Sequence, residues 1–241
     1  MAKLVTFDCY ATLVDFNLRP ATEKLLAERT LPHNFNVEAF FNEFRVMRYQ
    51  ACLEPYMTYE TMLHNTLNHV MTLHGLDFTS ADGQAMVAAV KTFGPFREVP
   101  AALNKLKEKY KIGIISNSDE DILRHNVELI GVDFDFVVSA EQVGAFKPKL
   151  EAFTQAWEIM GYEPKDVIHV AQGWEYDMLP TYKLDIARRV WINRRGQPGS
   201  NSFQPYDELS DLTLLPETLG ITSSPAHATA DSLLVGSEPT A

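Results

Sequence analysis

Short apolar runs recur along the chain, each rich in β-branched or aromatic residues and bounded by polar ones. Runs of this length and content are typical of buried β-strands. The first of them ends in an acidic residue. The predicted strands cover residues 3–8, 112–116, 134–139, 167–171 and 189–192.

The segments between these strands carry apolar residues at helical spacing, together with the residues that begin and end helices. Pro100 suits the first turn of one helix, and Asp119 and Gly131 are expected to begin and end a second. Residues 150–160 form a third helix, which Gly161 ends. This alternation predicts an α/β fold with a parallel sheet covered by helices on both faces. Ligands of such sheets bind at the carboxyl ends of the strands.

Residues 16–96 interrupt the alternation, because they contain almost no strand pattern and repeat apolar residues at helical spacing. We therefore predict a helical insertion after the first strand, with an α/β core formed by residues 1–15 and 97–221. Residues 222–241 are rich in Ser, Pro, Ala and Thr and carry little periodic apolar content, so a disordered tail is predicted there.

The composition is that of a soluble globular protein, since the 241 residues are 46% hydrophobic and 22% charged. It excludes a collagen-like, wholly disordered or disulfide-stabilised protein. The formal net charge of -11 disfavours nucleic acids and anionic membranes as partners, so a small anionic substrate would need a local cationic pocket. Two cysteines without framework spacing, and the lack of a secretory signal or a long apolar run, favour a cytoplasmic protein without a membrane span.

Asp8 stands at the end of the first predicted strand and is followed at once by a turn and by Thr12. A carboxylate fixed at a strand end can attack an electrophilic carbon or phosphorus atom and form a covalent intermediate. Three further groups of polar residues follow, at later strand ends or before a helix. They are Ser116 with Asn117, Lys147 before Pro148, and the loop of residues 172–177 with its two acids, Glu175 and Asp177.

Each candidate also has an ordinary structural interpretation. Asp8 and Asp177 could cap a strand or helix end, and Lys147 could be a solvated residue at a helix start. A turn alone would explain Ser116 and Asn117. Surface positions would explain the arginines of the insertion, and core packing would explain the nearby tyrosines.

Together, the four motifs in this order resemble those of the haloacid dehalogenase (HAD) superfamily, and within it those of the (S)-2-haloacid dehalogenases. The resemblance extends from Lys3 to about Arg195, and four ordered motifs are far more specific than any one alone. It implies a HAD-like core with a Rossmann-type parallel sheet. The helical insertion matches the family's cap domain in position and size.

Two positions separate the dehalogenases from the phosphatases of this superfamily. The phosphatases have a second Asp two places after the nucleophile and another Asp in the fourth motif that holds Mg²⁺, whereas this chain has Tyr10 and Gln172. The metal-independent dehalogenases carry Tyr at the first of these positions. Because Mg²⁺ prefers several anionic oxygen ligands, the resemblance implies a hydrolytic dehalogenase that uses no metal and no other cofactor.

The resemblance also implies a two-step mechanism for short 2-haloacids. Asp8 displaces the halide from the α-carbon and forms an ester, which water then hydrolyses to release a 2-hydroxy acid. The residues expected to orient Asp8 or to deliver the water are Thr12, Ser116, Lys147 and Asp177. Those expected at the substrate or halide are Tyr10, Arg45, Asn117, Gln172, Trp174 and Tyr176, with Arg48 as a second candidate for the arginine that binds the halide.

Two alternatives stay open. One is a phosphatase or other small-molecule hydrolase with an altered metal site. The other is a non-catalytic protein that binds small acids, because Gln172 and Trp174 replace the Ser and Asn that the dehalogenases carry in the fourth motif. In the main interpretation the partner is a small anionic haloacid, and a homodimer would be consistent with the relatives, which are often dimeric.

Overall fold

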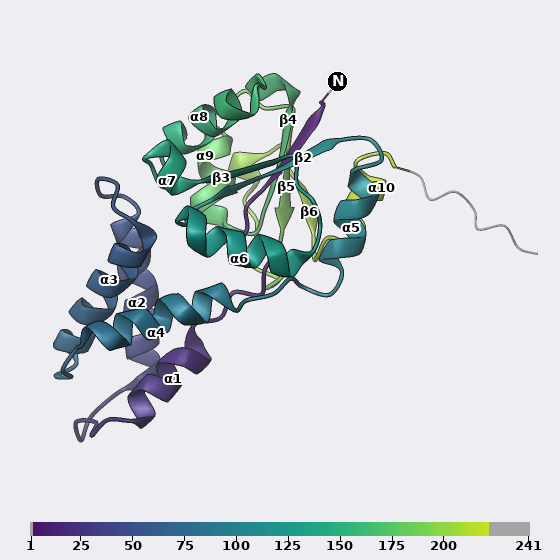
Figure 1. The fold of residues 1–241 in the computed structure, drawn as a ribbon. Coiled ribbons are helices and arrows are strands. Elements are labelled where there is room, and N and C mark those ends of the chain that lie inside the picture. Colours follow the sequence, from purple (N-terminus) through teal and green to yellow (C-terminus); the bar gives the residue numbers. More distant parts are fainter. Residues whose placement is uncertain (1, 222–241) are drawn as a thin grey trace, which may run out of the picture.

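The computed structural model describes residues 2–221, which form a six-stranded sheet in which all neighbouring strands are parallel (Figure 1). The strand order is β3-β2-β1-β4-β5-β6. The strands are β1 (Leu4–Phe7), β2 (Lys111–Ser116), β3 (Phe136–Ser139), β4 (Val167–Ala171), β5 (Arg188–Ile192) and β6 (Asp207–Leu209). The first five confirm the strands predicted from the apolar runs. The predicted disordered tail, residues 222–241, lies outside the described residues.

The edge strand β6 was not predicted. It has three residues, two of them acidic, and it pairs with β5 from Val190 opposite Asp207 to Ile192 opposite Leu209. A strand this short, with two acidic residues, contains no apolar run that would predict it from the sequence. It forms at the edge of the sheet because its backbone pairs with β5.

Helices cover both faces of the sheet, as predicted (Figure 1). Those that follow the insertion are α5 (Val99–Leu106), α6 (Glu120–Ile130), α7 (Ala140–Val143), α8 (Leu150–Met160), α9 (Leu179–Thr181) and α10 (Leu215–Thr218). Residues of α5, α6 and α10 join Val5 and Phe7 in one apolar cluster, and residues of α8 join Leu4 and Val138 in another. Within residues 2–221 no helix is long and apolar enough to cross a lipid bilayer.

Between β1 and α5 the chain forms four helices that pack on one another beside the sheet (Figure 1). They are α1 (Arg19–Ala27), α2 (Val37–Ala51), α3 (Tyr59–Leu73) and α4 (Ser80–Lys91). Buried apolar residues at helical spacing, such as Phe44 and Leu67, form their common core. Ile122 and Phe146 extend this cluster from segments that follow β2 and β3. The four helices therefore contact the segments beyond the carboxyl ends of the strands.

Asp119 precedes α6 as predicted, but its side chain does not cap that helix. Its carboxylate instead accepts hydrogen bonds from the backbone N–H groups of Tyr59 (2.7 Å) and Glu60 (2.9 Å), in the first turn of α3. α6 ends at Gly131, whose φ of 68° is one that glycine adopts without steric cost. The predicted capping residue thus serves a helix that is distant in sequence.

Candidate active site

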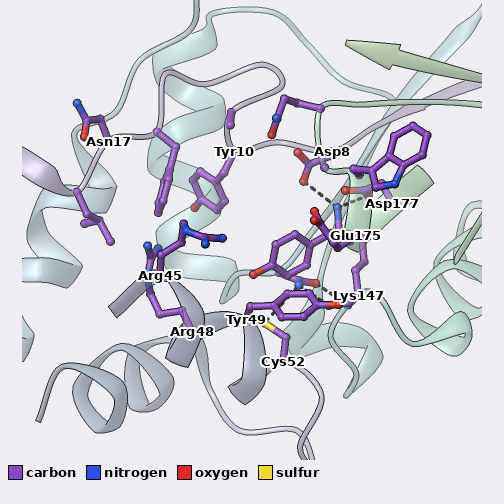
Figure 2. A pocket seen from close by; sticks show the side chains of 18 of the residues that line it. Asp8, Tyr10, Asn17, Arg45, Arg48, Tyr49, Cys52, Lys147, Glu175 and Asp177 are labelled. Carbon is purple, nitrogen blue, oxygen red and sulfur yellow. Dashed lines mark hydrogen bonds and ion pairs between the residues drawn. The ribbon is translucent and has the colours of Figure 1, made fainter. Parts of the chain in front are cut away.

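The carboxyl ends of β1, β2 and β4 lie side by side because these strands are parallel neighbours. The segments that follow them line a cavity of about 590 Å³, together with Lys147 and residues of α1, α2 and α3 (Figure 2). Thr12 and Ser116 are buried and do not belong to its lining. The predicted site residues that line it are Asp8, Tyr10, Arg45, Asn117, Lys147, Gln172, Trp174, Tyr176 and Asp177.

Lys147 lies between two buried carboxylates (Figure 2). Its Nζ donates hydrogen bonds to Asp8 Oδ1 and to Asp177 Oδ1, each at 2.7 Å. The other oxygen of Asp8, Oδ2, accepts a hydrogen bond of 2.6 Å from the Thr12 hydroxyl. The Thr12 oxygen in turn accepts the backbone N–H of Gln172 at 2.8 Å. Both oxygens of Asp8 are therefore held, so its carboxylate has a fixed orientation at the edge of the cavity.

Burial and the neighbouring charges act in opposite directions on this cluster. Burial raises the pKa of Asp8 above its usual value, although the Lys147 ammonium opposes this effect. At Asp177 burial also acts to raise the pKa, but Lys147 and His169 outweigh it and the pKa lies below its usual value. Burial acts to lower the pKa of Lys147, but the negative charges of Asp177 and Asp8 outweigh burial and raise this pKa to about 12. Lys147 therefore carries a positive charge at neutral pH.

The described residues do not fit a Mg²⁺ site of the phosphatase kind. Lys147 occupies the space between the carboxylates of Asp8 and Asp177. Tyr10 and Gln172, at the two positions where the phosphatases carry carboxylates, offer a phenol and a neutral amide, which are weak ligands for a hard cation. In the part of the chain that the structure describes, no group of three or more His, Cys, Asp and Glu side chains is arranged to hold a metal ion.

Ser116 and Asn117 follow the same strand but differ in their contacts. The Ser116 hydroxyl is buried and has no hydrogen-bond partner among the described residues. The Asn117 side chain holds the backbone of Lys147, since its Nδ2 donates to Lys147 O at 2.8 Å and its Oδ1 accepts Lys147 N–H at 2.7 Å. Asn117 thus positions Lys147, and its contact with a halide stays a prediction.

The two predicted tyrosines form aromatic walls of the cavity. The Tyr10 hydroxyl donates to Asn126 Oδ1 at 2.9 Å and lies 3.1 Å from Ser118 Oγ, so it is directed away from Asp8 toward α6. Tyr176 packs edge-on against Tyr49 of α2, with 5.0 Å between the ring centroids. Burial raises the pKa of both predicted tyrosines, so their hydroxyls stay protonated at neutral pH.

Gln172 and Trp174 line the cavity, and the loop that carries them also contacts Trp191 and Tyr206. The carbonyl oxygen of Gln172 accepts a hydrogen bond of 3.1 Å from Trp191 Nε1. The Trp174 ring packs edge-on against Trp191 at 4.8 Å and against Tyr206 at 5.5 Å. Packing against these two aromatic side chains thus explains the position of the Trp174 ring, and the contact of Trp174 with substrate stays a prediction.

Arg45 and Arg48 lie one turn apart on α2 and line the cavity across from Asp8 (Figure 2). Arg45 is exposed and donates to Asn42. Arg48 is half-buried, with its guanidinium 4.8 Å from the Phe44 ring centroid. Neither forms an ion pair with an acidic residue in the stretch 2–221. Arg48 is therefore the more buried of these two arginines.

His169, which is fully buried in β4, was not predicted as a site residue. Its Nε2 lies 3.1 Å from Asp177 Oδ1, and its Nδ1 lies 2.9 Å from Thr6 Oγ1. The sequence did indicate a special role, because His169 is the one polar residue in the buried strand Val167–Ala171. A polar group at such a position needs a hydrogen-bond partner.

Ala11, in the turn after Asp8, has a φ of 64° and is the one non-glycine residue with positive φ within residues 2–221. Its Cβ makes this left-handed conformation costly. We expect Ala11→Gly to raise the free energy of unfolding by about 1 kcal/mol in urea denaturation, after allowing for the greater entropy of the unfolded chain. The control, Ala85→Gly at an exposed position of α4, should lower it by about 1 kcal/mol. A loss of stability in the Ala11 variant would contradict the prediction.

Comparison with known proteins agrees with this architecture. The sequence of residues 2–179 matches the family of haloacid dehalogenase-like hydrolases. The (S)-2-haloacid dehalogenase of Pseudomonas fluorescens is 24% identical over 196 residues, which cover 78% of this chain and 83% of the relative. Pyrimidine 5'-nucleotidase YjjG of Escherichia coli (strain K12) is 28% identical over 128 residues, which cover 52% and 56%.

The solved structures show the same fold. That of the L-2-haloacid dehalogenase from Xanthobacter autotrophicus with chloropropionic acid covalently bound superposes with a TM-score of 0.77 at 18% identity. The match covers 92% of this chain and all of the other. The family match spans most of the chain, and the fold agrees with it. The chain therefore belongs to the haloacid dehalogenase-like hydrolases.

Proposed function

We propose that this hydrolase cleaves carbon–halogen bonds and converts short 2-haloacids to 2-hydroxy acids. The observation that carries the proposal is the buried arrangement of Asp8, Lys147 and Asp177, with Tyr10 and Gln172 at the two positions where a Mg²⁺-dependent phosphatase needs carboxylates. A carboxylate oriented at the edge of a cavity is a competent nucleophile for carbon.

In the first step an Asp8 oxygen attacks the α-carbon, the carbon–halogen bond breaks and the halide leaves with the bonding electron pair. Thr12 and Lys147 hold the carboxylate in one orientation, which lowers the entropic part of the barrier. The product is an ester between Asp8 and the α-carbon. Arg48, half-buried in the cavity wall, is the cation best suited to receive the halide.

In the second step water attacks the Asp8 carbonyl carbon, and its proton passes to Asp177 Oδ2. The bond between this carbon and the substrate oxygen then breaks, and the second proton of the water passes to the departing oxygen. This releases the 2-hydroxy acid and returns the Asp8 carboxylate with one oxygen from water, and Asp177 then gives its proton to solvent. Lys147, 2.7 Å from Asp8 Oδ1, stabilises the negative charge that develops on the attacked group.

The helices α1–α4 serve as a cap in this mechanism. They contribute Arg45, Arg48 and Tyr49 to the lining of the cavity, opposite the groups at the strand ends. A cap that closes over bound haloacid excludes bulk water and strengthens the interaction of the arginines with the anionic substrate.

A second candidate function is hydrolysis of phosphate esters, favoured by the similarity to the nucleotidase over about half of the chain. This reaction would also use Asp8 as nucleophile. It would depend on a divalent cation, for which Tyr10 and Gln172 provide no carboxylate.

The test is halide release from chloroacetate, bromoacetate and both enantiomers of 2-chloropropionate in the presence of EDTA. Multiple turnovers in EDTA are expected. An aryl phosphate with Mg²⁺ is the counter-test, and phosphate release without any halide release would favour the second candidate. Stabilisation by haloacids without either product would favour a binding protein instead.

The two arginines of α2 offer a matched pair of variants. We expect Arg48→Ala to lower kcat/KM for 2-chloropropionate by about 10²-fold, the effect of losing one charged contact with the leaving group. Arg45→Ala should lower it less than about threefold, because the exposed side chain is screened by water. Steady-state halide release measures both values. The reverse order would return the role of halide ligand to Arg45.

A further inference from the structure

The two oxygens of Asp177 have very different surroundings. Oδ1 accepts hydrogen bonds from Lys147 Nζ at 2.7 Å and is 3.1 Å from His169 Nε2. Oδ2 is buried and has no hydrogen-bond partner among residues 2–221. A buried carboxylate oxygen without a donor is costly, so its retention at the cavity points to a partner that comes with the reaction.

The neighbouring backbone packs closely against this oxygen. Gly173 precedes the π-helical turn Trp174–Met178 that carries Asp177. A Cβ atom at position 173 would collide with Asp177 Oδ2, so only glycine fits there without a shift. The free oxygen therefore lies against the Gly173 backbone, in the place that a side chain at position 173 would need.

The hydrogen bonds of His169 define which nitrogen carries its hydrogen. An ionised Asp177 can only accept, so Nε2 must be the donor in the 3.1 Å contact. In the neutral ring Nδ1 is then an acceptor, and the Thr6 hydroxyl at 2.9 Å is its donor. The ring also packs edge-on against Phe153, 5.4 Å between centroids. His169 is thus held as a donor aimed at one oxygen of Asp177.

We infer that His169 is a positioning residue for the second chemical step. By holding Asp177 Oδ1, it keeps Oδ2 turned toward the water that attacks the Asp8 ester and whose proton Oδ2 accepts. Lys147 contacts both carboxylates and so serves both steps, whereas His169 contacts Asp177 and not Asp8. This inference rests on the proposed function and adds that loss of His169 impairs ester hydrolysis selectively.

The test separates the two steps by rapid-quench measurement of chloride from (S)-2-chloropropionate at high enzyme concentration. For His169→Leu we expect a burst of one chloride per site at close to the wild-type rate, followed by turnover slowed about 10²-fold, the usual effect of impaired proton transfer. Mass spectrometry of the quenched protein should show the accumulated ester. His169→Gln, which keeps an N–H donor near the position of Nε2, should recover part of the turnover.

The control is Phe153→Leu, which alters the packing of the His169 ring but removes no hydrogen bond to Asp177. It should lower stability without producing a burst or an ester. Equal slowing of both phases in the His169 variants, or a burst in the Phe153 variant, would overturn this inference alone. No chloride from the wild-type protein would overturn the proposed function and this inference with it.

Discussion

Replacement of Asp8 by Asn is expected to lower kcat for halide release by about 10⁴-fold or more. The amide is a far weaker nucleophile than the carboxylate, and it cannot form the ester on which both steps depend. We expect this loss of activity to come from the lost nucleophile and not from unfolding. Asp8 lies at the end of a fully buried strand, and the isosteric Asn side chain preserves its packing. Halide release in EDTA, with thermal unfolding of the same sample, measures activity and fold together.

Asp15→Asn is the matched control, since Asp15 is an exposed carboxylate on the same segment. It should retain the wild-type rate. A single turnover of the wild-type protein in heavy-oxygen water should label the carboxylate of Asp8, because water attacks that group and not the α-carbon. Label in the 2-hydroxy acid instead, or undiminished activity of the Asp8 variant, would refute the ester mechanism.

The sheet and the order of the site residues could be predicted because both follow from local sequence. Buried strands of a parallel sheet are continuous apolar runs, and polar groups directly after them must meet at one edge. Asp8, Thr12 and Asp177 follow β1 and β4 and converge in the structure for this reason, and Lys147 reaches them from the segment after α7.

Other features depend on neighbours that no local pattern specifies. Asp119 has the sequence of a capping residue for α6, but the orientation of α3 decides which N–H groups it meets. Asn117 holds Lys147, and His169 holds Asp177, across distances of 30 and 8 residues. Arg48 is preferable to Arg45 only because its guanidinium packs over the rings of Phe16 and Phe44.

Lys147→Met should reduce both stability and activity, because it leaves two buried carboxylates without their shared cation. Removal of one partner from a buried ion pair costs about 3–5 kcal/mol, and loss of a charged donor beside the reacting group should lower kcat by about 10²- to 10³-fold. Lys149→Met is the control, since Lys149 bonds the backbone of Glu54 away from this cluster. Its activity and stability should stay near those of the wild type.

The pH dependence of the Lys147 variant follows from the same charges. Halide release needs ionised Asp8, so activity falls as pH drops through its pKa, which burial raises and Lys147 opposes. Without Lys147 this pKa rises further, and the acid limb of the pH profile should move to higher pH.

The pH dependence of stability should differ between the two proteins. In the wild type the lowered pKa of Asp177 stabilises the fold above the unfolded value of about 3.8 and this contribution is lost as pH falls, whereas the raised pKa of Asp8 acts in the opposite direction. In the variant both carboxylates bind protons more readily when folded, so acid relieves the buried charge. Urea denaturation across pH should therefore show the largest difference in unfolding free energy near neutrality and a smaller one in acid. A difference that is constant with pH would mean that Lys147 stabilises the fold through its packing and not through its charge.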